Sequence, residues 1–376
     1  MRIIEEEQLD FDDVLIQPKC SKILSRSEVN LMREFKWYDV DNTKKFTMAC
    51  IPYGTTNMGT VGVCSVAEKM VKSGHIACLE KHIPYEDIDM LFSHLSEEEQ
   101  ARAIPSIGIK EDCSTIEKLY GKWHLRLVMV DVPNGYIPSL VNRVKEIHQH
   151  CKDVCIIAGN VVDAAGAAQL MDAGVKIVKS GIGNGSVCLT RLKTGVGRPQ
   201  LSTLIEVADA CHQRGCYVMS DGGVNSAGDV CKAFGAGADF VISGSLFAGC
   251  DEANGETVSK WYKSNVVDCQ SNGPTMSYYP VYVEKKFKQY YGMSSHLAQE
   301  KHFGGIRSYS ASEGREKLIP CTGQLENVLN DIDGGLKSCC TYIGCTKMKN
   351  FSRHTTFYKV RRQLNTKFDV CQDISK

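Results

Sequence analysis

Residues 154–183 read VCIIAGNVVDAAGAAQLMDAGVKIVKSGIG, and they indicate the architecture better than any other segment. The apolar runs at 154–161 and 175–183 are typical of strands that are buried on both faces. Between them, Asp163 can accept an N-cap hydrogen bond and Gly174 can end a helix. The apolar face of that helix would carry Ala167, Leu170 and Met171. A strand–helix–strand unit of this kind predicts a parallel sheet.

The same alternation continues in both directions along the chain. Six further apolar runs are FTMACIP (46–52), HIACL (75–79), AIPSIGI (103–109), LRLVMVDV (125–132), CYVMSDGG (216–223) and ADFVISGS (238–245). Two more helical stripes are Leu201, Leu204, Ile205 and Ala208, ending at Gly215, and Val230, Ala233 and Phe234, ending near Gly235. Eight strands that alternate with helices predict a (β/α)8 barrel, the TIM barrel.

Three segments do not follow this pattern. We expect a single catalytic domain over residues 1–376, with an N-terminal extension at 1–45 and a C-terminal segment at 335–376. The stretch from about 250 to 300 has no clear periodicity, so we expect an irregular flap after strand eight. The loop at 182–200 is long and rich in glycine.

Composition excludes several classes of protein. Lys+Arg and Asp+Glu are equal at 44 each, which argues against a nucleic-acid binder. The acidic N-terminus lacks the apolar core of a signal peptide, and no apolar run reaches the roughly 18 residues of a membrane span. We therefore expect a soluble, cytoplasmic protein. The 18 cysteines match no zinc spacing and, in that compartment, indicate free thiols.

Glycine-rich turns follow the seventh and eighth predicted strands. They read Ser220-Asp221-Gly222-Gly223 and Ser243-Gly244-Ser245. In a (β/α)8 barrel these two loops often bind phosphate, since glycines let backbone N–H groups approach an anion. Asp221 has the wrong charge for phosphate and is better suited to ribose hydroxyls. The alternative is that both segments are merely tight turns.

Residues 181–191, GIGNGSVCLTR, carry the clearest sign of chemistry. Cys188 follows a strand end, and Arg191 would favour its thiolate. Thr190 can pass a proton, and Ser186 can contact phosphate or ribose. Carbonyl groups turned inward by the glycines can coordinate a monovalent cation. A structural thiol in a flexible loop is the alternative.

This loop resembles the catalytic loop of the IMP dehydrogenase / GMP reductase family. Other segments with the same resemblance, in the same order, are LDFDDVLIQP, NMGTVG, DVPNGY, AGNVV, KTGVGRPQLS, SDGGV, YGMSS, YSASEG, GGLKSCCTY and HTTF. The Thr-Arg pair after Cys188, the Glu313 segment and the lack of room for an inserted regulatory domain resemble the reductase branch of the family. The resemblance implies NADPH-dependent conversion of GMP to IMP in purine nucleotide salvage, through a covalent adduct on Cys188.

The resemblance also implies roles for particular residues. The catalytic residues would be Cys188, Thr190 and Glu313. The nucleotide would be bound by Ser186, Asp221, Gly222, Gly223, Gly244, Ser245, Met293, Ser294, Ser295, Ser310, Ala311, Ser312 and Gly314. NADPH would contact Ser25, Arg26, Lys81, Asp131, Val132, Pro133, Ser338, Cys339, Cys340 and Thr341, some of them across a subunit boundary of a homotetramer. Potassium would be held at Gly183, Gly185, Cys188 and Arg191.

Three positions depart from the family pattern. Ser310 stands where the family has Arg, Gly59 where it has Asp, and Pro133 where it has Ala. They bear on substrate preference and cofactor affinity, and they keep two alternatives open: an IMP dehydrogenase without its regulatory domain, and a weakened purine-nucleotide-binding protein. The ten histidines do not cluster in the sequence, so we expect no role for them.

Overall fold

The computed structural model describes residues 1, 3–39, 43–272, 275–305 and 311–361. The predicted barrel is confirmed, and every predicted run overlaps a barrel strand. The strands are β3 (Lys45–Thr55), β4 (His75–Cys78), β5 (Ala103–Ile104) with β6 (Ser106–Ile107), β7 (Leu127–Asp131), β8 (Cys155–Val161), β9 (Ile177–Ser180), β10 (Tyr217–Asp221) and β11 (Phe240–Ser243).

The strands form a closed parallel ring. β11 pairs with β3, where Val241 lies beside Tyr53, and each of the other strands pairs with its neighbours in chain order. β5 and β6 are two halves of one barrel strand, since only Pro105 separates them and proline has no N–H to donate to a ladder.

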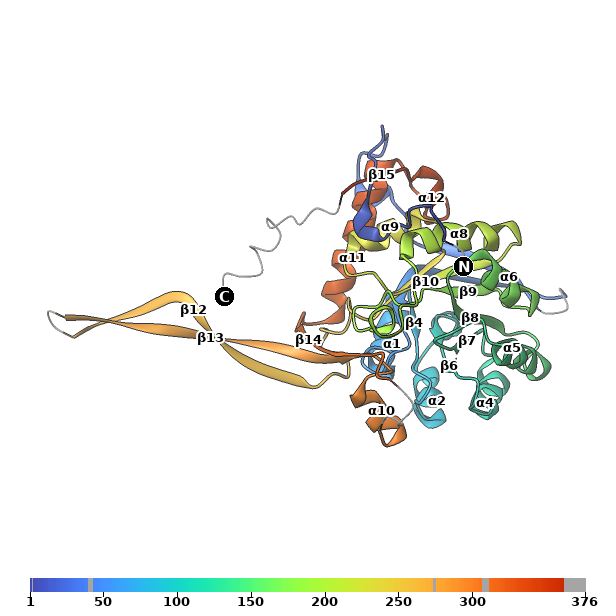
Figure 1. Cartoon of the computed structure of the whole chain (residues 1–376), viewed down its shortest axis with the longest axis horizontal. Helices are drawn as coiled ribbons and strands as arrows, with labels where there is room; N and C mark the ends of the chain where they lie inside the picture. The colour runs from blue at the N-terminus through green and yellow to red at the C-terminus, as the bar shows by residue number, and fades with distance from the viewer. Residues whose placement is uncertain (2, 40–42, 273–274, 306–310, 362–376) are drawn as a thin grey trace.

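Helices follow the strands and surround the ring (Figure 1). They are α1 (Cys64–Lys72), α2 (Tyr85–Ser93), α3 (Glu97–Gln100), α4 (Ser114–Trp123), α5 (Pro138–His150), α6 (Ala164–Asp172), α7 (Thr190–Thr194), α8 (Gln200–Gln213), α9 (Ala227–Gly235), α11 (Leu325–Ile343) and α12 (Phe351–His354). Asp163 caps α6 as expected, accepting from the Gly166 N–H at 2.8 Å. Ile205 was expected on the buried face of α8 but is 49% exposed, since it lies about 100° around the helix from Leu204.

The barrel interior is apolar at one end and polar at the other. Met129, Ile157 and Met219 point inward and form a buried cluster. The short strand β2 (Arg33–Tyr38) pairs antiparallel with β3, and its Phe35 stacks on Phe240 with 4.1 Å between ring centroids. The N-terminal extension therefore covers the end at which the strands begin, which leaves the other end open for a site.

The two ends of the described chain meet beside the barrel. β1 (Val14–Ile16) pairs antiparallel with β15 (Phe357–Lys359). The described residues also form three 3-10 turns: η1 (Phe11–Asp13), η2 (Arg26–Glu28) and η3 (Met348–Asn350).

The expectation of an irregular segment at about 250–300 is wrong. β12 (Thr257–Asn272) and β13 (Thr275–Tyr291) form a long antiparallel hairpin that extends far from the barrel in Figure 1. β14 (Glu316–Pro320) joins its base, and α10 (His296–Phe303) lies between β13 and β14 in the chain. Where its side chains are described, at 257–264 and 278–287, the hairpin is exposed or half-buried on both faces. These residues therefore lack the apolar alternation that predicts a half-buried strand.

No helix in the described part of the chain has both the length and the apolar character of a membrane span.

Candidate active site

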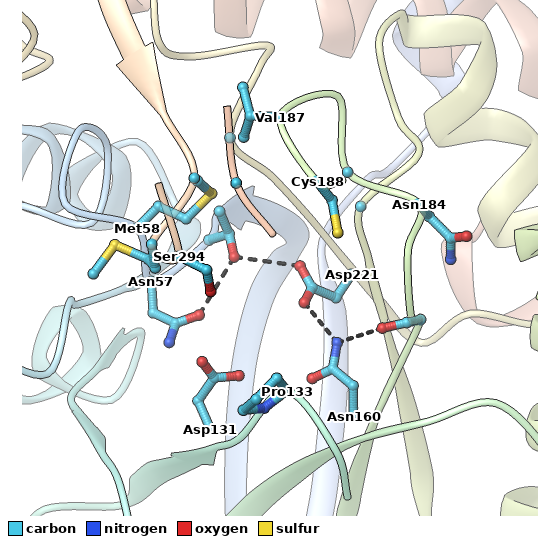
Figure 2. A pocket seen from close by; sticks show the side chains of 18 of the residues that line it. Asn57, Met58, Asp131, Pro133, Asn160, Asn184, Val187, Cys188, Asp221 and Ser294 are labelled. Atoms are coloured by element: carbon cyan, nitrogen blue, oxygen red, sulfur yellow. Dashed lines mark hydrogen bonds between the residues drawn. The ribbon is translucent and has the colours of Figure 1, made fainter. Parts of the chain in front are cut away.

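A cavity of about 720 Å³ opens where the barrel strands end, and residues at the end of each barrel strand or shortly after it line the cavity. This is the end at which barrel enzymes carry their chemistry. Figure 2 shows Cys188 and Asp221 facing the same space from different elements. Predicted site residues that line the cavity are Lys81, Asp131, Val132, Pro133, Gly183, Gly185, Ser186, Cys188, Thr190, Asp221, Gly222, Gly223, Gly244, Ser245, Met293, Ser294, Glu313 and Gly314.

The Cys188 thiol lies at the start of a hydrogen-bonded chain. Its Sγ donates to Thr190 Oγ1 at 3.2 Å, and Thr190 Oγ1 donates to Glu313 Oε2 at 2.7 Å. All three side chains are partly buried. A proton on the sulfur therefore has a continuous path to a carboxylate.

Backbone pairing between two distant segments creates this chain. The Leu189 N–H donates to the Glu313 carbonyl at 2.6 Å, and the Arg315 N–H donates to the Val187 carbonyl at 2.9 Å. Cys188 and Gly314 form the bridge between them. The segment after α10 thus places Glu313 beside the start of α7, which lies more than a hundred positions earlier in the chain.

The two glycine turns lie beside the thiol loop. Gly222 and Gly223 have φ of +82° and +78°, a region that favours glycine. A Cβ on Gly222 would come within 3.2 Å of the Gly185 nitrogen, so this turn needs glycine for close approach as well. The Ser245 hydroxyl, from the second turn, bonds the Val224 carbonyl at 3.2 Å. The backbone N–H groups expected to cradle an anion and the expected nucleophile therefore line one cavity.

A buried lysine organises the carboxylates at the bottom of this cavity. Lys179, at the end of β9, is 3% exposed and lies 2.7 Å from Asp131 Oδ1 and 2.5 Å from Asp221 Oδ2. Burial pulls the pKa of Lys179 down, but the two carboxylates more than offset this and raise it. Asn160 donates to the same Asp221 oxygen at 2.9 Å, and Thr56 donates to the other at 3.3 Å.

Sequence reasoning missed Lys179. The signal was present, because a lysine inside an otherwise apolar strand is rarely buried without a partner. Asn57, Met58, Asn160 and Tyr290 also line the cavity and were not singled out. Nothing in their local sequence distinguishes them from ordinary strand-end residues.

Several predicted nucleotide contacts lie at the edge of the cavity. Met293 and Ser294 line it, whereas among the described residues Ser295, Ala311 and Ser312 do not. The Ser295 side chain caps α10 by accepting from the Ala298 N–H. Ser310 lies outside the described residues.

Six of the predicted cofactor contacts lie elsewhere in this chain. Ser25 and Arg26 are at η2, which packs against α11, and α11 carries Ser338, Cys339, Cys340 and Thr341. None of these six lines the cavity of its own chain, and Cys340 has no exposed surface. Lys81 does line it, with its Nζ 3.6 Å from Glu111 Oε1.

The loop expected to hold a cation has an unusual backbone at Gly183, where φ is +81°. Arg191 lies against it, and its guanidinium bonds the Asn184 amide oxygen and the Arg198 carbonyl. The Gly185 carbonyl accepts from the Cys188 N–H at 3.0 Å. Because a carbonyl oxygen has a second lone pair, this bond leaves Gly185 able to coordinate an ion.

Comparison of the sequence with known proteins identifies a family. The model of the IMP dehydrogenase / GMP reductase domain matches residues 8–266 and 270–365. The chain is 40% identical over 375 residues to a GMP reductase of Ascaris suum, covering 98% of each protein. It is 40% identical over 368 residues to GMP reductase 1 of Mus musculus, covering 98% of this chain and 99% of that protein. A GMP reductase of Phytophthora infestans is 39% identical over 373 residues, covering 98% of this chain and 94% of that protein.

Proposed function

Because the chain belongs to the IMP dehydrogenase / GMP reductase family, we propose that it reduces GMP to IMP and releases ammonia, with NADPH as the reductant. The observation that carries the proposal is the hydrogen-bonded chain from Cys188 through Thr190 to Glu313, in the same cavity as the two glycine turns. Purine nucleotide salvage in the cytoplasm would be the setting for this reaction.

The first step uses the proton path. The Cys188 proton moves through the Thr190 hydroxyl to Glu313, and the thiolate attacks C2 of the guanine ring. The bond between C2 and the exocyclic nitrogen then breaks, which leaves C2 bound to the Cys188 sulfur as a thioimidate. The departing nitrogen takes the proton back along the same path and leaves as ammonia, because an unprotonated amine is a poor leaving group. Glu313 therefore acts first as the base and then as the acid.

The rest of the cavity orients the nucleotide. The N–H groups of the two turns would receive the phosphate, with Gly222, Gly223, Gly244 and Ser245 nearest to it. Asp221 would accept hydrogen bonds from the ribose hydroxyls, since Lys179 and Asn160 hold its carboxylate in place. These contacts turn the attack on C2 into a reaction of fixed geometry.

The residues around Lys81 fit a nicotinamide cofactor. When bound, the cofactor supplies the hydride that reduces the purine carbon attached to sulfur. Asp131, Val132 and Pro133 also line the cavity and offer an acceptor and apolar surface. Lys81 can pair with a cofactor phosphate. Pro133 has no N–H, so it offers one hydrogen-bond donor fewer than another residue would.

A homotetramer and a potassium ion complete the proposal. The residues at η2 and on α11 do not line the cavity of their own chain, which is why we assign Ser25, Arg26, Ser338, Cys339 and Thr341 to the cofactor of a neighbouring subunit. Cys340 has no exposed surface, so this assignment leaves it out. Potassium prefers uncharged oxygen ligands, and the backbone carbonyls of residues 183, 185, 188 and 191 are of that kind. We also propose that residues 1–376 form one catalytic domain.

The test is a product assay. Incubation of the protein with GMP and NADPH should consume the reductant and yield IMP and ammonia in equal amounts, as identified by mass spectrometry. XMP formed from IMP and NAD would instead support the dehydrogenase alternative. Nucleotide binding without turnover would support a weakened binding protein. The three relatives named above are GMP reductases, which favours the reductase.

A further inference from the structure

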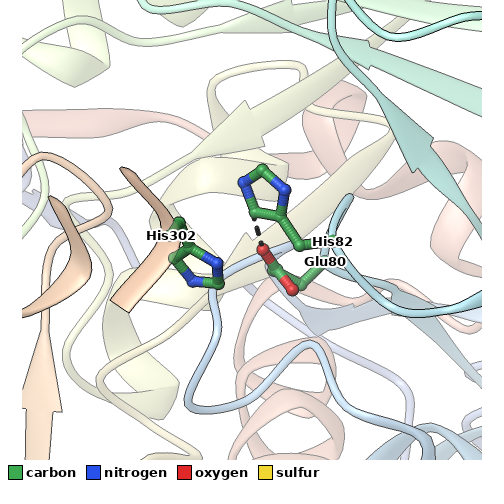
Figure 3. A group of neighbouring side chains, drawn as sticks. All are labelled: Glu80, His82 and His302. Atoms are coloured by element: carbon green, nitrogen blue, oxygen red, sulfur yellow. Dashed lines mark ion pairs between the residues drawn. The ribbon is translucent and has the colours of Figure 1, made fainter. Parts of the chain in front are cut away.

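A second cluster of polar side chains lies beside the same cavity, which its member His82 lines. Glu80 and His82 belong to the connection between β4 and α2, and His302 lies in the last turn of α10 (Figure 3). One ligand atom from each residue lies within 4.8 Å of the other two. The two imidazole rings stack with 4.3 Å between their centroids. The expectation that the histidines do not cluster is therefore wrong for this pair.

The carboxylate in this cluster is buried and incompletely satisfied. Glu80 is 6% exposed, and its Oε1 accepts no hydrogen bond among the described residues. Its nearest basic group is His82 Nε2, at 3.8 Å, too far for a hydrogen bond. An unpaired buried carboxylate oxygen is costly, so its position next to two imidazoles calls for a third partner.

We propose that Glu80, His82 and His302 bind a divalent first-row transition metal of the zinc class, with water as the fourth ligand. Two imidazoles and one carboxylate are a common three-ligand set for zinc. Metal–ligand distances of about 2.0–2.2 Å place tetrahedral ligand atoms about 3.4 Å apart, so the ligand atoms, which lie within 4.8 Å of one another, need to close by up to about 1.4 Å. Rotation of the two half-buried imidazole side chains about their side-chain torsions can supply this movement. The partial negative charge at the C-terminal end of α10 favours a cation beside His302.

The consequence is a link between two walls of the cavity. His302 is carried by the helix that directly follows the cavity residues Met293 and Ser294, whereas Glu80 and His82 flank Lys81. A bound ion would join α10 to the β4–α2 connection and restrict how far the rim can open. The site rests on its own residues and is independent of the reaction proposed above.

Cobalt(II) is the probe, because its visible spectrum distinguishes ligand type. Purified full-length protein, stripped with a chelator, should bind one equivalent of Co²⁺ and gain the visible bands of a tetrahedral nitrogen and oxygen site. Zn²⁺ should displace the cobalt, and Mg²⁺ should not. Strong sulfur-to-cobalt charge-transfer bands would instead assign binding to the 18 cysteines and overturn the proposal.

Two variants on one helix make the control. His302→Ala should weaken Co²⁺ binding at least tenfold, whereas His296→Ala, at the opposite end of α10, should leave it unchanged. Equal binding by both variants, or no binding by the unaltered protein, refutes the site. If circular dichroism shows that the His302→Ala variant does not fold, Glu80→Gln provides the test of Co²⁺ binding. That variant keeps the shape of the side chain, and unchanged affinity would again refute the site.

Discussion

Replacing Thr190 with valine removes one hydroxyl from the proposed proton path and changes little else. Among the described residues, that hydroxyl is the link between the Cys188 sulfur, at 3.2 Å, and the Glu313 carboxylate, at 2.7 Å. Valine has nearly the shape of threonine, so the loop and the cavity should persist. The sulfur would then lose its route for giving up a proton, and the departing amine would lose its route for gaining one.

The size of the effect follows from what a positioned acid–base group contributes. We expect kcat/KM for GMP to fall about 10²- to 10⁴-fold, which corresponds to about 2.7–5.4 kcal/mol of barrier. Nucleotide affinity should change by less than about threefold, because the lost interaction acts on the transition state and not on ground-state binding.

The assay is steady-state oxidation of NADPH with GMP, combined with calorimetric measurement of nucleotide binding. Thr190→Ser keeps the hydroxyl and should retain most of the activity. Thr194→Val, one turn along α7, removes an exposed hydroxyl that donates to the Thr190 carbonyl and accepts from the Val196 N–H. Because neither bond involves Cys188 or Glu313, this variant should behave as the unaltered protein. A Thr190→Val enzyme within tenfold of full activity would refute the proton path.

Three further outcomes are expected. Lys179→Met leaves two carboxylates close together and uncompensated, so the free energy of unfolding should fall by about 3–5 kcal/mol in urea titrations, and an unchanged midpoint would contradict this. Gly244→Ala places a methyl group against the Tyr290 hydroxyl, so we expect a loss of about 1–3 kcal/mol of stability and a raised KM for GMP; wild-type values for both would argue against a tight turn at this point. A hydrogen bond to Asp239 raises the pKa of His212, so this pair stabilises the fold fully below the unfolded pKa of about 6.5 and loses that contribution as pH rises through the folded pKa. His212→Gln should abolish that part of the pH dependence of the thermal midpoint.

Much of the barrel could be predicted from local sequence. Strands such as β8 are buried on both faces, so their residues form continuous apolar runs that are visible without a structure. Helix α6 could be predicted from Asp163 and Gly174, because helix capping depends on residues within one turn of the helix end. The turns at Gly222 and Gly244 were found because their positions follow from the strands.

Other features depended on groups that are distant in the chain. Glu313 bonds Thr190 across 123 positions, and physical reasoning from either segment alone assigns it to solvent; a family resemblance was needed to single it out. The hairpin of β12 and β13 is held by pairing between its own strands and against β14, which apolar periodicity does not report.

Interactions between near neighbours in the chain determine its local properties. These are the segments that form strands, the residues at which helices begin and the positions that require glycine, and they can be predicted from the sequence alone. The chemistry of the site depends on side chains that are distant in the sequence and close in the fold. Lys179 acquires its two carboxylates because the closed barrel brings separate strand ends together. Cys188 acquires its proton acceptor, and His302 its neighbouring ring, because α10 and the segment after it fold back over those strand ends. Such contacts cross many intervening residues, so no local pattern can specify them.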